Sequence, residues 1–168
     1  MKWGCYWKRE IYCADYKTIF AAVLLHYICG ILSALFGGSA SMYRYLTLPH
    51  FAPPPFVFVL IWSFIYLLLG VALGCYLSSY ECGRSRWRFN TCFLYGVFLL
   101  GLFLWYPIFF GAELFSFALV TAACIVSASL FVFRHFIKRS RLAAFLLLPC
   151  VAFFVFAFFL NFCILLLN

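Results

Sequence analysis

Long runs of apolar residues alternate with short polar segments along the chain. The apolar runs cover about residues 18–37, 56–80, 89–110, 114–136 and 142–167. Each run reaches roughly 20 residues, the length that an α-helix needs to cross about 30 Å of hydrocarbon. The pattern therefore predicts an all-α fold, an integral membrane bundle of five transmembrane helices. The membrane domain would span residues 18–168 and follow a cytoplasmic or interfacial lead-in of residues 1–17.

Composition excludes a water-soluble protein. The chain has 168 residues, of which 68% are hydrophobic, and its mean hydropathy is +1.11. Because soluble domains are about half apolar, the surplus must face lipid. The segment Gly38-Ser-Ala-Ser41 resembles a signal-peptide cleavage site. The apolar run before it is longer than a usual signal core, so we interpret it as a retained first span.

The net charge of +8 is distributed unevenly over the two sides of the predicted bundle. Of the 12 Lys and Arg residues, 11 fall on the side of the N-terminus and only Arg44 on the other. This asymmetry predicts a cytoplasmic N-terminus and an outer C-terminus. The cations then serve as topology determinants near anionic headgroups rather than as a nucleic-acid surface. The larger group comprises Lys2, Lys8, Arg9, Lys17, Arg84, Arg86, Arg88, Arg134, Lys138, Arg139 and Arg141.

The nine cysteines do not form a recognisable metal or disulfide pattern. Most lie in apolar spans, where a free cysteine behaves as a small hydrophobe. The others, Cys5, Cys13 and Cys82, fall on the predicted cytoplasmic side, which is reducing. No spacing resembles a zinc site. We expect free thiols and no metal.

Two polar residues within the spans require partners. His26 falls near the middle of span one, where an ionisable group is either functional or a neutral imidazole bonded to a neighbouring helix. The second interpretation is favoured. Asn161 lies in the outer third of span five, and its amide should face the bundle interior or a cavity because exposure to lipid is costly.

Three further features concern helix packing and helix ends. Gly70 and Gly74 form a small-residue pair that permits close helix approach, within the chain or in a dimer. Pro107 removes a backbone hydrogen bond and can open the end of span three. Glu113 is expected to cap span four, where its charge favours the positive end of the helix dipole.

The sequence lacks the groups that most enzymes and ion-coupled transporters use. Its four acidic residues all lie outside the depths of the spans, and it has no Ser/His/Asp set or Gly-rich phosphate loop. Aromatic residues make up 24% of the chain. We expect Trp62, Tyr66, Trp105, Phe109 and Phe153 to converge in the outer half of the bundle. Their faces would stack on a planar apolar ligand such as a tetrapyrrole.

Three segments resemble the TspO/MBR family of translocator or tryptophan-rich sensory proteins. The first is Tyr43-x-x-Leu46-x-x-Pro49-x-Phe51-x-Pro53-Pro54, followed by Trp62-x-x-x-Tyr66-x-x-x-Gly70. The second runs from Trp105 to Ala112. The third runs from Pro149 to Phe153 and on to Ala157-x-x-Leu160-Asn161-Phe162. They occur in the family's order and cover roughly residues 30–168.

The resemblance implies a five-helix membrane protein, commonly homodimeric, whose cavity lies beneath the first loop. Family members bind porphyrins and, in some cases, sterols or benzodiazepine-type ligands. For this chain it implies protoporphyrin IX or a haem-like tetrapyrrole as the ligand, no obligatory cofactor, a bacterial cell membrane and a role in sensing, sequestration or transport. The implied ligand-binding residues are Tyr43, Phe51, Pro53, Pro54, Trp62, Tyr66, Trp105, Phe109, Phe153, Ala157 and Asn161.

The chain departs from the family at several positions. Met42, Phe51 and Phe153 replace family tryptophans, Leu102 replaces a common Asn, and Thr121 replaces a common Asp. Some bacterial members are reported to degrade protoporphyrin through indoles of spans two and five, so enzymatic breakdown is an alternative function. Trp62 is the only candidate catalytic residue, because Phe153 is much harder to oxidise than a tryptophan. A second alternative is a non-catalytic scaffold with a vestigial cavity.

The sterol-recognition pattern of the family needs a basic residue at the end of span five. Leu160-Asn161-Phe162 is followed only by Cys-Ile-Leu-Leu-Leu-Asn168. Sterol binding through that pattern is therefore not expected.

Overall fold

The computed structural model describes residues 15–38, 40–79 and 86–168, and this part contains five helices long and apolar enough to cross a membrane. They are α2 (Tyr16–Gly37), α3 (Pro55–Ser78), α4 (Arg86–Tyr106) with its extension η2 (Pro107–Gly111), α5 (Phe115–Ile137) and α6 (Arg141–Leu167). A short 3-10 helix, η1 (Ala40–Arg44), lies between α2 and α3. The predicted fold class is confirmed. Most of the predicted lead-in, with Cys5 and Cys13, and also Cys82, lie outside the described residues.

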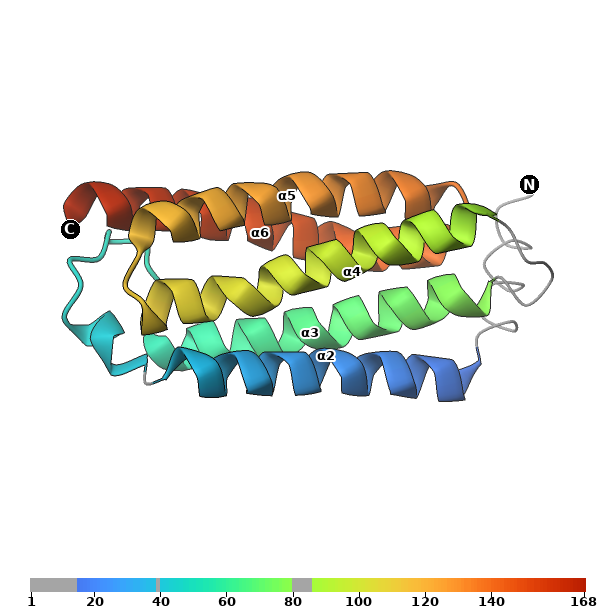
Figure 1. Cartoon of the computed structure of the whole chain (residues 1–168), viewed down its shortest axis with the longest axis horizontal. Coiled ribbons are helices and arrows are strands. Elements are labelled where there is room, and N and C mark those ends of the chain that lie inside the picture. Colours follow the sequence, from blue (N-terminus) through green and yellow to red (C-terminus); the bar gives the residue numbers. More distant parts are fainter. Residues whose placement is uncertain (1–14, 39, 80–85) are drawn as a thin grey trace.

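The five helices run antiparallel in one elongated bundle (Figure 1). The most extensive contacts join α2 to α3, α3 to α6, α6 to α5, and α5 to α4, whereas α2 meets α4 only sparsely. The helices thus form a ring that is loosest between its first and third spans. The loop that carries η1 lies at the same end of the bundle as the C-terminus of α6 (Figure 1); we call it the loop end.

Local sequence explains where the helices begin. The Asp15 carboxylate accepts hydrogen bonds from the N–H groups of Lys17 and Thr18 and from the Thr18 hydroxyl, at 3.3, 3.1 and 2.7 Å. The hydrogen bond from the Thr18 hydroxyl lowers the pKa of Asp15, which keeps this N-cap charged. Pro54 precedes α3, and Pro55 occupies its first turn. Proline is tolerated there because the N–H groups of a first turn have no acceptor within the helix.

Gly70 and Gly74 pack against α2 within the chain. A Cβ added at Gly70 would lie 2.5 Å from the Cα of Val23, and one at Gly74 would lie 2.5 Å from the Cα of Ile19. Only glycine allows the two backbones to approach so closely. Of the two roles left open for this pair, the structure shows packing within the chain, and α2 already covers this face.

The connection between α4 and α5 starts with a turn of π-helix. Pro107 begins a π-helical turn, in which the N–H of Ala112 donates to the Pro107 carbonyl at 2.8 Å. Glu113 then adopts a left-handed backbone with φ of 57°. The N-cap of α5 is Leu114, without a side-chain cap, and its first turn has no acidic residue. The capping role predicted for Glu113 is therefore wrong, because its backbone conformation ends the connection before the helix starts.

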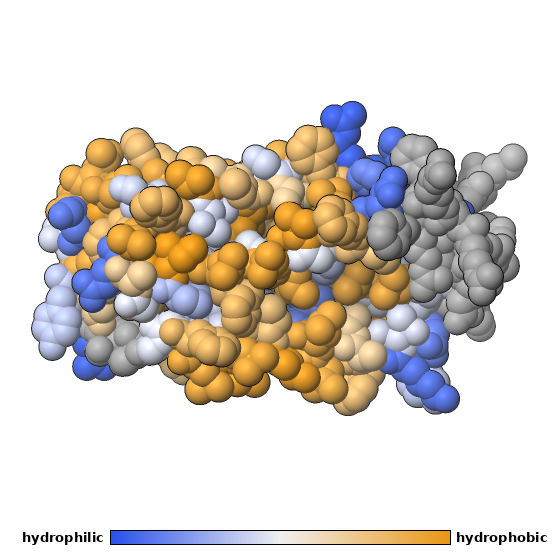
Figure 2. Space-filling view, viewed as in Figure 1, coloured by the Kyte–Doolittle hydropathy of each residue, from blue (hydrophilic) through white to orange (hydrophobic). Residues whose placement is uncertain are grey.

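The surface of the bundle is that of a membrane protein. Figure 2 shows apolar residues over the middle of the visible face and hydrophilic residues gathered at its two ends. Among the described cations, Lys17, Arg134, Lys138, Arg139 and Arg141 belong to the end where α2 and α6 begin and α5 finishes, and Arg44 belongs to the loop end. The six cysteines in the described part form no disulfide with one another.

Candidate ligand-binding site

Trp62 is the centre of an aromatic cluster in the half of the bundle next to the loop end. Its indole stacks on Trp105 of α4, with ring centroids 5.7 Å apart and planes at 27°. Phe153 of α6 meets Trp62 edge-on at 5.4 Å, and Tyr66, one turn further along α3, lies 5.7 Å away. The structure therefore brings four of the eleven implied ligand-binding residues into direct contact, from three different helices.

The loop is anchored to the bundle through Tyr43. This residue of η1 is buried, and its hydroxyl donates to the Pro53 carbonyl at 3.0 Å. Burial raises the pKa of the Tyr43 phenol, so the hydroxyl stays protonated and remains a donor. Its ring stacks on Phe58 at 6.1 Å. The loop, held by these contacts of Tyr43, thus closes the end of the bundle over the aromatic cluster.

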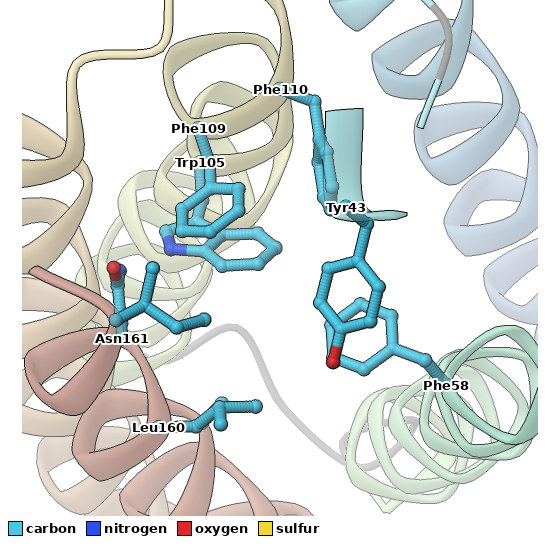
Figure 3. Close-up of a pocket in the computed structure, with 9 residues that line it drawn as sticks. Tyr43, Phe58, Trp105, Phe109, Phe110, Leu160 and Asn161 are labelled. Carbon is cyan, nitrogen blue, oxygen red and sulfur yellow. The ribbon is translucent and has the colours of Figure 1, made fainter. Parts of the chain in front are cut away.

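Beneath Tyr43 lies a small pocket, shown in Figure 3. Tyr43, Phe58 and Phe110 stand on one side of it, opposite Trp105, Phe109, Leu160 and Asn161 (Figure 3). Ala157 and Ile164 complete the lining. Five implied ligand-binding residues meet here, yet the free volume is only about 10 Å³. A cavity of this size holds one water molecule at most.

Two buried polar groups, one in the small pocket and one in the aromatic cluster, lack partners among the described residues. Asn161 is 1% exposed, and neither its Oδ1 nor its Nδ2 atom makes a hydrogen bond. The indole Nε1 of Trp62 is likewise enclosed and unbonded. Each such group costs about 1–3 kcal/mol when buried without a partner. In native proteins such groups call for an explanation, for which a bound molecule is one candidate.

A larger cavity shares the side chains of Phe58 and Trp105 with the small pocket. It has a volume of about 260 Å³ and is lined by residues of α2, α3 and α4. Trp62, Tyr66 and Trp105 belong to its wall, as expected. The residues that sequence reasoning did not assign to a site are Tyr27, Gly30, Ile31, Ser33, Ala34, Phe58, Val59, Ser63, Leu102 and Tyr106. Their signals in the sequence were the small residues Gly30 and Ser33 within a bulky span and the replacement of a common family Asn by Leu102.

The remaining implied residues lie outside both cavities. Phe51 is about half exposed, at 47%, and stacks on Phe159 of α6 at 5.9 Å. Pro53 contributes the carbonyl that binds Tyr43, and Pro54 precedes α3. These residues position the loop.

Two departures from the family pattern have clear structural consequences. Leu102, in place of a common Asn, is buried and contributes an apolar wall to the larger cavity. The Thr121 hydroxyl, in place of a common Asp, donates to the Phe117 carbonyl of its own helix at 2.9 Å. Within the residues that the structure describes, no group of three or more His, Cys, Asp or Glu side chains could hold a metal ion.

Comparisons with known proteins address the identity of this bundle. A search of curated proteins finds no match. The model of the TspO/MBR family matches residues 21–167, which include most of the first span, all of the other four and both cavities. The chain therefore belongs to the TspO/MBR family.

Proposed function

We propose that this membrane protein binds a planar hydrophobic ligand, a tetrapyrrole such as protoporphyrin IX, at the Trp62–Trp105 pair. The observation that carries the proposal is that Trp105, which stacks on Trp62, lines both cavities, and that the Trp62 N–H and the Asn161 amide beside them have no partner among the described residues. Sensing, sequestration or transport of the ligand would be its role.

The chemistry of the site suits a flat, largely apolar molecule. Indole and phenol rings offer faces for offset stacking, which adds about 0.5–1.5 kcal/mol per pair beyond area burial. The Asn161 amide and the Trp62 N–H supply the few polar contacts that orient a ligand in an apolar pocket.

Binding a tetrapyrrole requires the cavities to expand. The larger cavity, about 260 Å³, lies just below the usual range of about 300–1,000 Å³ for ligand pockets. Phe58 and Trp105 line both cavities. A change in the rotamers of these two side chains would join the cavities into one.

A scaffold with a vestigial cavity is the second candidate function. It is favoured by the pocket beneath Tyr43, in which side chains leave only about 10 Å³. In that case the aromatic rings fill the family's cavity permanently, and no porphyrin displaces them.

A titration of the detergent-purified protein with protoporphyrin IX separates these functions. The absorbance of the porphyrin is followed for the wild type, Trp62→Ala and Phe64→Ala. Phe64 is the matched control, because it lies two residues from Trp62 but is 57% exposed on the lipid-facing surface. We expect saturable binding that Trp62→Ala weakens by about tenfold, equivalent to 1.4 kcal/mol, and that Phe64→Ala leaves unchanged. Unsaturable uptake by all three proteins would support the scaffold.

The same samples test the enzymatic alternative. Under illumination, new absorbing products in the wild type that disappear in Trp62→Phe would indicate porphyrin breakdown. Phe153→Trp restores the second indole of the family at a position whose native ring centroid lies 5.4 Å from that of Trp62. Turnover gained only in Phe153→Trp would show that this chain binds the ligand without degrading it.

We also infer that the N-terminus is cytoplasmic, that the membrane is a bacterial cell membrane and that the protein is a homodimer. The support for the orientation is the one-sided distribution of cations, and for the dimer it is the family alone. Labelling of Thr47→Cys in intact cells by an impermeant maleimide tests the orientation. Light scattering of the purified protein tests the dimer.

A further inference from the structure

The larger cavity reaches the lipid-facing surface between α2 and α3. Two of its lining residues are largely exposed, Ile31 of α2 at 60% and Val59 of α3 at 62%. Its inner wall is Trp105, which is 6% exposed. The cavity thus extends from the apolar surface of the bundle to the aromatic cluster.

The contact between α2 and α3 is uneven along its length, which accounts for this opening. Towards the end where α2 begins, Gly70 and Gly74 bring the two backbones together. Towards the loop end, the helices are joined by the Tyr27 hydroxyl, which donates to the Ser63 carbonyl at 2.9 Å. The backbones there are separated by a side chain, the ring of Tyr66.

Gly30 forms a notch in this second region. A Cβ at Gly30 would lie 2.6 Å from Cε2 of Tyr66, so the tyrosine ring occupies the space of the missing side chain. The ring of Tyr66 therefore stands between the opening and Trp62, which it contacts at 5.7 Å. Rotation of this one side chain would change the width of the passage.

Polar groups on the wall of the cavity indicate what it would accept. The hydroxyls of Ser33 and Ser63 donate to backbone carbonyls of Phe103 and Val59. Among the described residues, the hydroxyls of Tyr66 and Tyr106 have no hydrogen-bond acceptor. No Lys, Arg or His lines the described cavity. The wall can therefore donate hydrogen bonds but cannot neutralise an anion.

We propose that the ligand enters this site laterally from the bilayer, between α2 and α3, and that it is a flat, membrane-dissolved molecule with an uncharged hydrogen-bond acceptor at its edge. A carbonyl, an ester or a protonated carboxyl group would meet the hydroxyls of Tyr66 and Tyr106. This inference rests on the proposed function and names the access route and the ligand class of the same site.

Substitutions at the mouth of the cavity test the route. Val59→Phe adds bulk at an exposed lining position, and Leu60→Phe adds it one residue along, at a residue 52% exposed that does not line the cavity. Protoporphyrin IX dimethyl ester is delivered from vesicles to the protein in vesicles, and its association is followed by stopped flow. We expect Val59→Phe to slow association by about tenfold, equivalent to 1.4 kcal/mol, and Leu60→Phe to change it little. Equal rates in both variants would overturn lateral access.

A second readout does not depend on ligand binding. The triple variant Trp3→Phe/Trp7→Phe/Trp87→Phe retains only the tryptophans of the cluster, Trp62 and Trp105. In bilayers whose acyl chains carry bromine, quenching of these indoles reports whether lipid reaches the cavity. We expect quenching that Gly30→Leu reduces and Gly96→Leu does not, because a Cβ at Gly96 meets nothing within 4 Å. Unquenched fluorescence would overturn the opening, whether or not porphyrin binds.

The ligand class has its own test. Tyr66→Phe removes one hydroxyl and keeps the ring. It should weaken binding of the dimethyl ester by about fivefold, the loss of one hydrogen bond of about 1 kcal/mol. Binding of an alkyl-substituted porphyrin without carbonyl groups should not change. Equal weakening of both probes would show that Tyr66 acts through packing. If neither probe binds the wild type, the proposed function fails, and the bromine experiment alone decides on the opening.

Discussion

His26 of α2 and Tyr95 of α4 are joined by a hydrogen bond of 2.8 Å between Nε2 and the tyrosine oxygen, deep inside the bundle. The other ring nitrogen of His26, Nδ1, lies 2.7 Å from the carbonyl oxygen of Ala22. Because a carbonyl can only accept, Nδ1 carries the hydrogen, and Nε2 accepts from Tyr95. The geometry fits a neutral imidazole bonded to a neighbouring helix, as the sequence analysis favoured. It also joins two spans that otherwise have few contacts with each other.

The first prediction is that the pair stabilises the bundle because each residue supplies the buried hydrogen-bond partner of the other. Tyr95→Phe leaves Nε2 of a fully buried histidine without a donor, and we expect it to lower the free energy of unfolding by about 1–3 kcal/mol. The double variant His26→Leu/Tyr95→Phe should lose less than the sum of the single losses, because neither polar group remains. Chemical unfolding in detergent measures the free energy of unfolding of His26→Leu, Tyr95→Phe and the double variant. Tyr45→Phe, at a residue 87% exposed, is the control; strict additivity would contradict the prediction.

The second prediction concerns the glycine pair of α3. Gly74→Ala places a methyl group against the backbone of α2, which cannot move aside as a side chain can. We expect a loss of about 1–3 kcal/mol, typical of overpacking, without a change of oligomeric state. Gly96→Ala, where the added Cβ meets nothing within 4 Å, should be tolerated. Thermal unfolding and light scattering check the two parts; a dissociated oligomer with unchanged unfolding would instead assign the pair to a dimer interface.

The third prediction is that replacing Asn161 raises the stability of the ligand-free protein and weakens ligand binding. Asn161→Leu replaces an enclosed amide, which has no partner among the described residues, by an apolar group of similar size. We expect the ligand-free protein to gain about 1–3 kcal/mol of unfolding free energy and to bind porphyrin more weakly. Asn90→Leu, at an exposed position of α4, is the control. Destabilisation by Asn161→Leu would show that the amide has a partner inside the bundle.

The helices could be predicted from the sequence because lipid imposes a simple rule on length and hydropathy. Residues 142–167 and 56–80 were expected as spans, and the structure has Arg141–Leu167 and Pro55–Ser78. The contact of Trp62 with Tyr66 follows from helical spacing. The partner of His26 could not be predicted, because Tyr95 lies 69 residues away and any polar group on a neighbouring helix would have sufficed.

The shape of the site could not be predicted from the sequence, for a different reason. Cavity volume depends on the rotamers of large rings, and the rings of Phe58 and Trp105 contribute to both cavities. Gly30 resembled any glycine in a membrane helix until the Tyr66 ring was seen beside it. The capping role predicted for Glu113 is wrong because its left-handed backbone follows from the π-helical turn before it. The sequence indicates a disturbed helix end at Pro107 but does not specify a π-helical turn there.

The last prediction concerns how the loop is held. The side chain of Asn168 accepts from the Thr47 N–H at 2.9 Å and donates to the Thr47 carbonyl at 3.1 Å. Asn168→Ala removes both bonds, so we expect the Thr47 amide to exchange hydrogen faster by about fivefold or more, the effect of losing about 1 kcal/mol. Thr47→Ala is an exacting control, because Thr47 contributes only backbone atoms to these bonds and alanine keeps them. Hydrogen exchange followed by mass spectrometry compares the two variants. No acceleration in Asn168→Ala would show that other contacts hold the loop. Acceleration in Asn168→Ala alone would show that the contact between Asn168 and Thr47 holds the loop that closes the pocket beneath Tyr43.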